Sequence, residues 1–158
     1  MAAPEGVINA IDEVIALFNA RKMDLPDNFF DRKTQFLING APFETLLGQS
    51  PADALILMLT RGPAGFRFTA KGLQHALPDA RVVPSTPPTQ LVESASLRAS
   101  RPSIAFKLRL LGTLRDSGEA VDTMVDVTLR LTPAGLVETA EASMDPGTLE
   151  QIRQARRS

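Results

Sequence analysis

Two segments in the second half of the chain, residues 104–114 and 121–131, alternate apolar and polar residues with the period of two that is typical of β-strands. The turn-forming run Asp116-Ser117-Gly118-Glu119 lies between them, so the pattern predicts an antiparallel hairpin. With Arg115 opposite Ala120, apolar residues face apolar partners: Ile104 with Leu131, Phe106 with Leu129, Leu108 with Val127, Leu110 with Val125, and Leu114 with Val121. The other face pairs polar and charged residues: Arg109 with Asp126, Lys107 with Thr128, and Thr113 with Asp122. We therefore expect one face of the hairpin to be buried and the other to be exposed.

Helical spacing of apolar residues is found near the start of the chain. It predicts a helix over about residues 5–21, with apolar positions at Val7, Ile11, Val14, Ile15 and Phe18. A single helical turn is expected at residues 27–30, just after Pro26. A further helix is expected to open at Ser50-Pro51-Ala52-Asp53, because Ser50 can cap free amides and Pro51 fits the first helical position, and to end at Arg61-Gly62-Pro63.

Shorter alternating patterns predict the other strands. Residues 33–39 read as a strand that ends at the turn signal Asn39-Gly40. Phe66, Phe68 and Ala70 also alternate with polar residues, and a bulge at Gly72 would explain the later shift of the apolar positions to Leu73 and Leu77. The remaining expectations are a surface loop over residues 84–88, a strand over about 90–98 and a last strand over 136–144.

The end of the chain is expected to be a helix. Asp145-Pro146 is suited to start a short basic helix that continues through Ile152. We therefore expect one domain over residues 1–145 and a short basic C-terminal tail helix over residues 146–158, with Arg153, Arg156 and Arg157 on a solvated helix end.

Composition excludes several classes of function. The 158 residues include no Cys, which removes thiol catalysis, thiolate metal sites and disulfides, and suits a cytoplasmic protein. No apolar stretch of about 18 residues is present, so no membrane association is expected. The net charge of -1 and the absence of Tyr and Trp argue against nucleic acid as a partner. No phosphate-binding loop or metal-ligand spacing is found, and no cofactor or metal is expected.

Several local motifs agree with a known family. Leu17-Phe18-Asn19-Ala20-Arg21 followed by Asp24 is similar to the end of that family's first helix, and residues 36–42, 48–54 and 131–137 are similar to its first strand, the start of its third helix and its final hairpin. Together with the order helix, short helix, strand, helix and long antiparallel strands, they resemble the nuclear transport factor 2-like superfamily, which includes ketosteroid isomerase, scytalone dehydratase and SnoaL-type polyketide cyclases and has a cystatin-like fold. The resemblance implies an α+β cone, in which a curved antiparallel sheet wraps around N-terminal helices and encloses an apolar cavity.

The resemblance and the hairpin pattern together predict a ligand pocket. Its expected residues are Phe18, Phe30, Phe36, Asn39, Phe68, Phe106, Leu108, Leu110, Val125 and Val127. Many members of the superfamily pair through the outer sheet face, so a homodimer is expected there, with Leu111 beside Met124 among charged residues. The alternative is that this pair is an ordinary exposed apolar spot.

The catalytic groups of the superfamily are not reproduced. The isomerase branch resembles proton abstraction by a carboxylate, with a tyrosine and a protonated aspartic acid holding the oxyanion. This chain has no Tyr, the position nearest the basic aspartate is Asn39, and the position nearest the oxyanion aspartate falls on or near Val127. Dehydratase-type sites resemble histidine-carboxylate pairs beside tyrosines, which one His and no Tyr cannot supply.

Three residues are candidates for catalysis, each with a simpler explanation. His75 could be turned toward the cavity by the expected bulge, although a lone histidine is more often structural. Glu138 and Glu141 lie on opposite faces of the last strand, so one of them can point inward and the other toward solvent. Asn39 is also explained by its turn, and Asp122 and Asp126 by cross-strand pairing on the outer face.

Three hypotheses follow. The first is a protein that binds a small apolar molecule in its cavity without a recognisable catalytic set. The second is a SnoaL-like isomerase, cyclase or dehydratase that uses His75, Glu138 or Glu141. The third is a dimeric protein-interaction module whose cavity is filled by its own phenylalanines.

Overall fold

The structure, a computed structural model, describes residues 5–22, 29–39, 41–42, 63–91 and 103–157. Within these ranges the helices are α1 (Glu5–Asn19), α4 (Pro63–Ala76) and α5 (Pro146–Arg157). The strands are β1 (Phe30–Ile38), β2 (Ala41–Pro42), β3 (Arg81–Pro84), β4 (Thr89–Leu91), β5 (Ser103–Thr113), β6 (Ala120–Leu131) and β7 (Val137–Ser143).

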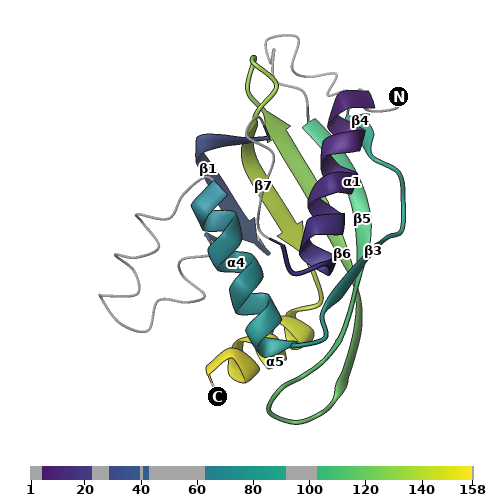
Figure 1. Cartoon of the computed structure of the whole chain (residues 1–158), viewed down its shortest axis with the longest axis vertical. Coiled ribbons are helices and arrows are strands. Elements are labelled where there is room, and N and C mark those ends of the chain that lie inside the picture. Colours follow the sequence, from purple (N-terminus) through teal and green to yellow (C-terminus); the bar gives the residue numbers. More distant parts are fainter. Residues whose placement is uncertain (1–4, 23–28, 40, 43–62, 92–102, 158) are drawn as a thin grey trace.

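The strands form one open, mixed sheet. Its order is β2-β1-β7-β6-β5-β3, and β4 also pairs with β5. Neighbouring strands are antiparallel except β1 and β7, which run parallel, with Phe36 beside Ala140. The buried hydroxyl of Thr34 donates a hydrogen bond to the carbonyl of Val137 at 2.6 Å at this parallel junction. Figure 1 shows α1 and α4 lying over one face of the sheet and α5 near one end, which confirms the predicted α+β class.

The hairpin of β5 and β6 has the predicted faces but a different register. Ile104 is opposite Leu129 and Leu108 is opposite Val125, so the predicted pairing is wrong by two residues. Because the shift is even, the same side chains still point inward, and Ile104 and Leu110 are fully buried. Arg109 is now opposite Met124, and its side chain forms an ion pair with Asp122, diagonally across the hairpin, rather than with Asp126. The Nε of Arg109 lies 2.7 Å from Oδ1 of Asp122.

The cause of the register error is the loop between the two strands. The loop is longer than expected, because the last strand pair is Thr113 with Ala120. Within the loop, the backbone N–H of Leu114 donates to the carbonyl of Glu119, and the backbone N–H of Gly118 donates to the carbonyl of Leu114. Arg115, predicted to face Ala120, instead donates its backbone N–H to the carbonyl of Ala76 at the end of α4. Leu114 is therefore buried in the core instead of continuing the ladder.

The segment expected to be a bulged strand is helix α4. Ala70, Ala76 and Leu77 are buried and Phe66 and Leu73 pack against them, which is the three- and four-residue spacing of one helix face. Pro63 occupies the first helical position. The sequence alternates over only Phe66 to Ala70, too short a run to separate a strand from a helix. The bulge at Gly72 was therefore a wrong prediction.

Most other elements lie where the sequence places them. Helix α1, strand β1 and strand β7 are confirmed, whereas β3 was not predicted. Phe30 already belongs to β1, not to a helical turn, and the rest of that turn lies outside the described residues. The helix expected to open at Ser50 and most of the strand expected over residues 90–98 also lie outside the described residues.

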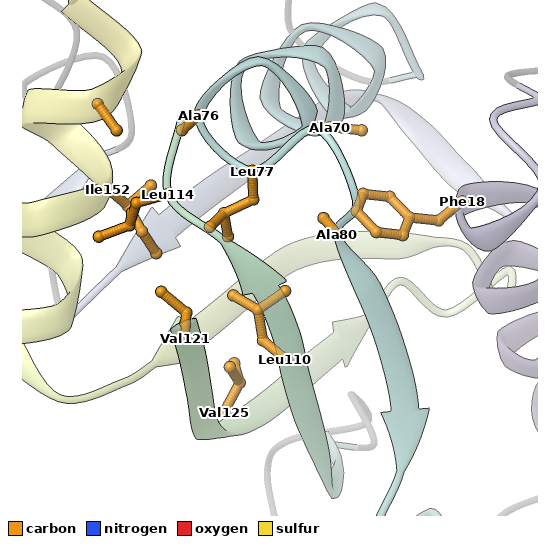
Figure 2. Close-up of a cluster of buried hydrophobic side chains, with 11 residues drawn as sticks. Phe18, Ala70, Ala76, Leu77, Ala80, Leu110, Leu114, Val121, Val125 and Ile152 are labelled. Carbon is orange, nitrogen blue, oxygen red and sulfur yellow. The ribbon is translucent and has the colours of Figure 1, made fainter. Parts of the chain in front are cut away.

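Helix α5 is part of the core. It extends to Arg157, beyond the predicted Ile152, and buries Ile152 and Ala155. Figure 2 shows Ile152 and Leu114 on one side of a cluster that Leu77, Leu110 and Phe18 continue toward α1. A second cluster joins α1 to β1 and the hairpin. Within the described residues, no helix is long and apolar enough to cross a membrane.

The end of α1 is fastened to the chain before β3. Arg21 takes a left-handed conformation (φ 61°), and the N–H of Lys22 bonds the carbonyl of Leu17, as in a Schellman cap. The guanidinium of Arg21 then donates to the carbonyls of Ala80 at 2.7 Å and Pro78 at 2.9 Å. These contacts fix one wall of the space between the helices and the sheet.

Candidate ligand cavity

A cavity of about 270 Å³ lies between the helices and the inner face of the sheet. Helix α1 contributes Phe18, helix α4 contributes Phe66 and helix α5 contributes Leu149, while the sheet supplies side chains from β1, β3, β5, β6 and β7. Its surface is almost entirely apolar. The curved sheet and the three helices therefore border a partly open space in which an apolar group would lose much of its contact with water.

Most of the predicted pocket residues do line this cavity. They are Phe18, Phe30, Phe36, Phe106, Leu108, Leu110, Val125 and Val127. The side chain of Phe68 is not among those that the structure describes, and Asn39 is not part of the lining. The hairpin residues were found because an even change of register leaves each side chain on its face.

Two phenylalanines outside the predicted pocket residues, Phe29 and Phe66, complete an aromatic wall. Phe66 stacks on Phe30 with ring centroids 5.2 Å apart, and Phe29 meets Phe30 edge to face at 4.8 Å. Phe36 also contacts Phe30 edge to face at 5.6 Å. Phe66 was missed because its segment was interpreted as a strand; the helical spacing with Ala70 and Leu73 was the signal for it.

Asn39 has a structural role in a turn. It has a left-handed backbone (φ 51°), as its turn position predicted. Its side-chain Nδ2 donates to the carbonyl of Met144 at 3.0 Å, and its Oδ1 accepts the N–H of Met144 at 2.8 Å. These bonds hold the end of β1 against Met144, which directly follows β7 and lines the cavity.

His75 lies outside the cavity lining. It is exposed at the end of α4, and its ring nitrogens are 2.8 and 3.0 Å from Nη1 of Arg115. The expectation that a bulge turns this side chain inward is overturned, because the segment is a helix whose buried face carries Ala70, Leu73 and Leu77 instead.

The two glutamates of β7 are separated by the structure. Ala140 and Ala142 face the cavity, and Glu141 between them pairs with Thr128 on the outer face of the sheet, so it borders the cavity without its carboxylate entering it. Glu138 is not part of the lining. The carboxylate of Glu141 has no ion pair or hydrogen bond within the described part of the chain. None of the three candidate catalytic residues therefore places its side chain in the cavity.

A second charged residue of the lining is Arg153 of α5, which the sequence placed on a solvated helix end. That expectation is wrong, since only 29% of its side chain is exposed. Its Nη1 donates to Oε2 of Glu150 at 2.9 Å, one helical turn earlier. The four-residue spacing from Leu149, also in the lining, was the available signal, because it puts both side chains on one helix face.

The groups with shifted pKa values lie away from the cavity. Hydrogen bonds from the backbone N–H and the hydroxyl of Thr113 hold the pKa of Asp79 below its usual value. The hydrogen bond from Arg109 likewise lowers the pKa of Asp122 on the outer face of the hairpin. Among the described residues, no group of three or more His, Asp or Glu side chains could hold a metal ion.

Comparison with known proteins identifies the fold. No family model matches the chain, and no curated protein matches it in sequence. Among solved structures, a SnoaL-like polyketide cyclase from Agrobacterium tumefaciens is 15% identical with a TM-score of 0.54, covering 92% of this chain and 95% of that one. A nuclear transport factor 2-like superfamily protein from Salmonella enterica is 13% identical with a TM-score of 0.57, covering 88% of each chain.

A cystatin-fold protein from Novosphingobium aromaticivorans gives a similar match, with 12% identity, a TM-score of 0.55, and coverage of 90% of this chain and 97% of that one. At these identities the similarity concerns the fold and not the activity. The matches extend over nearly the whole chain and agree with the observed α+β architecture. The chain therefore has the nuclear transport factor 2-like fold.

Proposed function

We propose that this protein binds a small, mainly apolar molecule in the cavity between its helices and its sheet. The observation that carries the proposal is the cavity itself, about 270 Å³ with an almost wholly apolar lining. Cavities of this kind favour ligands whose apolar surface leaves water on binding. The phenylalanines leave this space open, which argues against an interaction module whose cavity is filled by its own side chains.

The volume limits the size of the ligand. An apolar cavity of about 150 Å³ holds one benzene molecule. The space here is nearly twice as large, so it suits a compact body of about two fused rings or a short branched chain. Steroid-sized molecules would need the cavity to widen.

Native mass spectrometry of freshly purified protein, followed by denaturation to release any bound molecule, is the direct test. A discrete added mass that disappears on denaturation supports the proposal. If nothing is bound, naphthylmethanol serves as a two-ring probe, and its fluorescence can be followed easily because the chain contains no Trp or Tyr. Absence of saturable binding would contradict the proposal.

A matched pair of variants locates the binding. Ala140→Leu places extra volume in the cavity lining and is expected to weaken probe binding at least about tenfold, as overlap with the ligand costs more than about 1.4 kcal/mol. Ala16→Leu adds the same atoms at an exposed position of α1 and should leave binding unchanged. Equal affinity in both variants would show that the probe binds elsewhere.

A further inference from the structure

The described lining of the cavity offers a ligand almost no hydrogen-bonding group. Its polar side chains are those of Thr69, Glu141 and Arg153. Thr69 already has an interaction partner within the protein, and Glu141 pairs with Thr128 on the outer face of the sheet. The Nη1 of Arg153 donates to Glu150, and its Nε is buried. The surface that remains toward the cavity is almost entirely apolar.

Such a surface penalises any polar group that a ligand brings into it. A hydroxyl, carbonyl or carboxylate would lose its hydrogen bonds to water and find no replacement in the described lining. A bridging water cannot restore these bonds, because a buried water itself needs about two to four polar partners. The part of the ligand that enters the cavity should therefore carry no hydrogen-bonding group.

The lining also has an aromatic character that a ligand ring can use. The rings of Phe30, Phe36 and Phe66 form one cluster: the centroid of Phe66 is 5.2 Å from that of Phe30 and 6.3 Å from that of Phe36, and Phe30 and Phe36 are 5.6 Å apart. The three ring planes are inclined to one another, and all three residues line the cavity. An aromatic ligand can join this cluster through offset or edge-to-face contacts, which stabilise ring pairs beyond their buried area.

Building on the proposed function, we propose that the part of the ligand held in the cavity is an aromatic hydrocarbon without a hydrogen-bonding substituent. Its rings contact the cluster of Phe30, Phe36 and Phe66 and the aliphatic side chains of the hairpin, among them Leu108 and Val127. Because the cavity is partly open, a polar group elsewhere in the ligand stays in contact with water. Selection then operates by excluding polar groups rather than by binding one.

Two naphthalene derivatives of nearly the same shape test the exclusion of polar groups. Dimethylnaphthalene and dihydroxynaphthalene are used, each with its two substituents at opposite ends of the ring system, so that no orientation keeps both substituents at the opening. Their affinities are measured at neutral pH with the full chain, by the fluorescence of the probes. Dimethylnaphthalene is expected to bind at least about tenfold tighter, because at least one hydroxyl would be buried without a partner.

A pair of variants on α4 tests the aromatic contact. The probes are naphthalene and decalin, its fully saturated counterpart, whose affinity is measured by displacement of naphthalene. Phe66→Leu removes one ring of the cluster and should lower the ratio of naphthalene to decalin affinity at least about twofold. Leu73→Met changes another lining residue of the same helix without removing a ring and should leave the ratio unchanged. Thermal melting of both variants confirms that they are folded.

The outcomes separate the two proposals. If neither dimethylnaphthalene nor naphthylmethanol binds saturably, the proposed function fails. If naphthylmethanol binds but dihydroxynaphthalene binds as tightly as dimethylnaphthalene, the cavity holds a hydrogen-bonding partner, so the aromatic-hydrocarbon proposal is wrong and the cavity proposal stands. An unchanged affinity ratio in Phe66→Leu would likewise overturn the aromatic-hydrocarbon proposal, because the ligand would then gain nothing from the phenylalanine cluster.

Discussion

Asn19 and Val82 form a two-way hydrogen bond: the Asn19 side-chain Nδ2 donates to the carbonyl of Val82 at 2.9 Å, and its Oδ1 accepts the N–H of Val82 at 2.8 Å. The amide thus satisfies an edge of β3 that no strand of the described residues pairs, and it attaches α1 to the sheet. Asn19 is the central residue of the motif that resembled the superfamily's first helix.

Replacing Asn19 by Leu should therefore lower the free energy of unfolding by about 1–3 kcal/mol, because two part-buried backbone groups of Val82 lose their partner. Urea unfolding followed by circular dichroism measures this change. The matched control is Asn9→Leu at an exposed position of the same helix, expected within about 0.5 kcal/mol of the parent. Equal stability of the two variants would show that the Asn19 contact contributes nothing.

The buried face of the hairpin provides a second prediction. Leu110 is 2% exposed and lines the cavity, so Leu110→Asp should prevent folding, and Leu110→Ala should cost about 2–5 kcal/mol. On the other face, Asp126 is exposed and its carboxylate lies 3.8 Å from Nζ of Lys107. Asp126→Asn should change stability by less than about 0.5 kcal/mol. Thermal melting compares the variants, and an unchanged melting temperature for Leu110→Asp would refute the assignment of the faces.

Asp79 should make stability depend on pH. Its pKa is lowered in the folded protein by hydrogen bonds from the backbone and hydroxyl of Thr113, so folding favours the ionised carboxylate. The stabilisation is then present above the unfolded pKa, about 3.9, and is lost as pH falls through the lower folded value. Unfolding in urea at several pH values between about 2 and 6 measures it. Asp79→Asn should flatten the acid side of the profile relative to the parent; an identical slope would contradict the prediction.

The expected homodimer through the outer sheet face is a further testable proposal. Met124 is 48% exposed, and Leu111 lies diagonally from it on the same face, next to Asp122. Met124→Lys should shift a dimer toward monomer in sedimentation equilibrium, because a charge would be buried in the contact. Asp116→Lys, in the exposed loop of the hairpin, introduces the same side chain elsewhere and should leave assembly unchanged. A parent protein that sediments as a monomer would exclude the dimer.

The sequence predicted the faces of the hairpin better than its pairing. Burial acts on each side chain through the period of two, so Phe106, Leu108 and Leu110 were assigned correctly to the inner wall. Register depends on the loop, and the hydrogen bond from Arg115 to the carbonyl of Ala76 that lengthens this loop joins positions 39 residues apart in the chain. No local pattern contains that contact.

Helix α4 and the charged residues at the margin of the cavity show the limits of local patterns. The alternation from Phe66 to Ala70 fits a strand over five residues, and only tertiary packing of Leu73 and Leu77 favours the helix. For Glu141 and Glu138, alternation could not decide the orientation, and the outward placement of Glu141 follows only from its pairing with Thr128. Arg153 had the helical spacing of a lining residue, yet its charge favoured the solvated interpretation.

The parallel junction of β1 and β7 has a consequence for how the protein folds. Thr34 and Val137, joined by a buried hydrogen bond, are 103 positions apart in the chain, so β1 cannot pair with β7 until that long intervening segment has been made. Until then the aromatic side chains of Phe30 and Phe36 have no complete sheet to cover them. Such long-range pairing slows folding and leaves apolar surface open to aggregation. During synthesis on the ribosome, the N-terminal third of this chain is therefore the part that we expect to depend on chaperones.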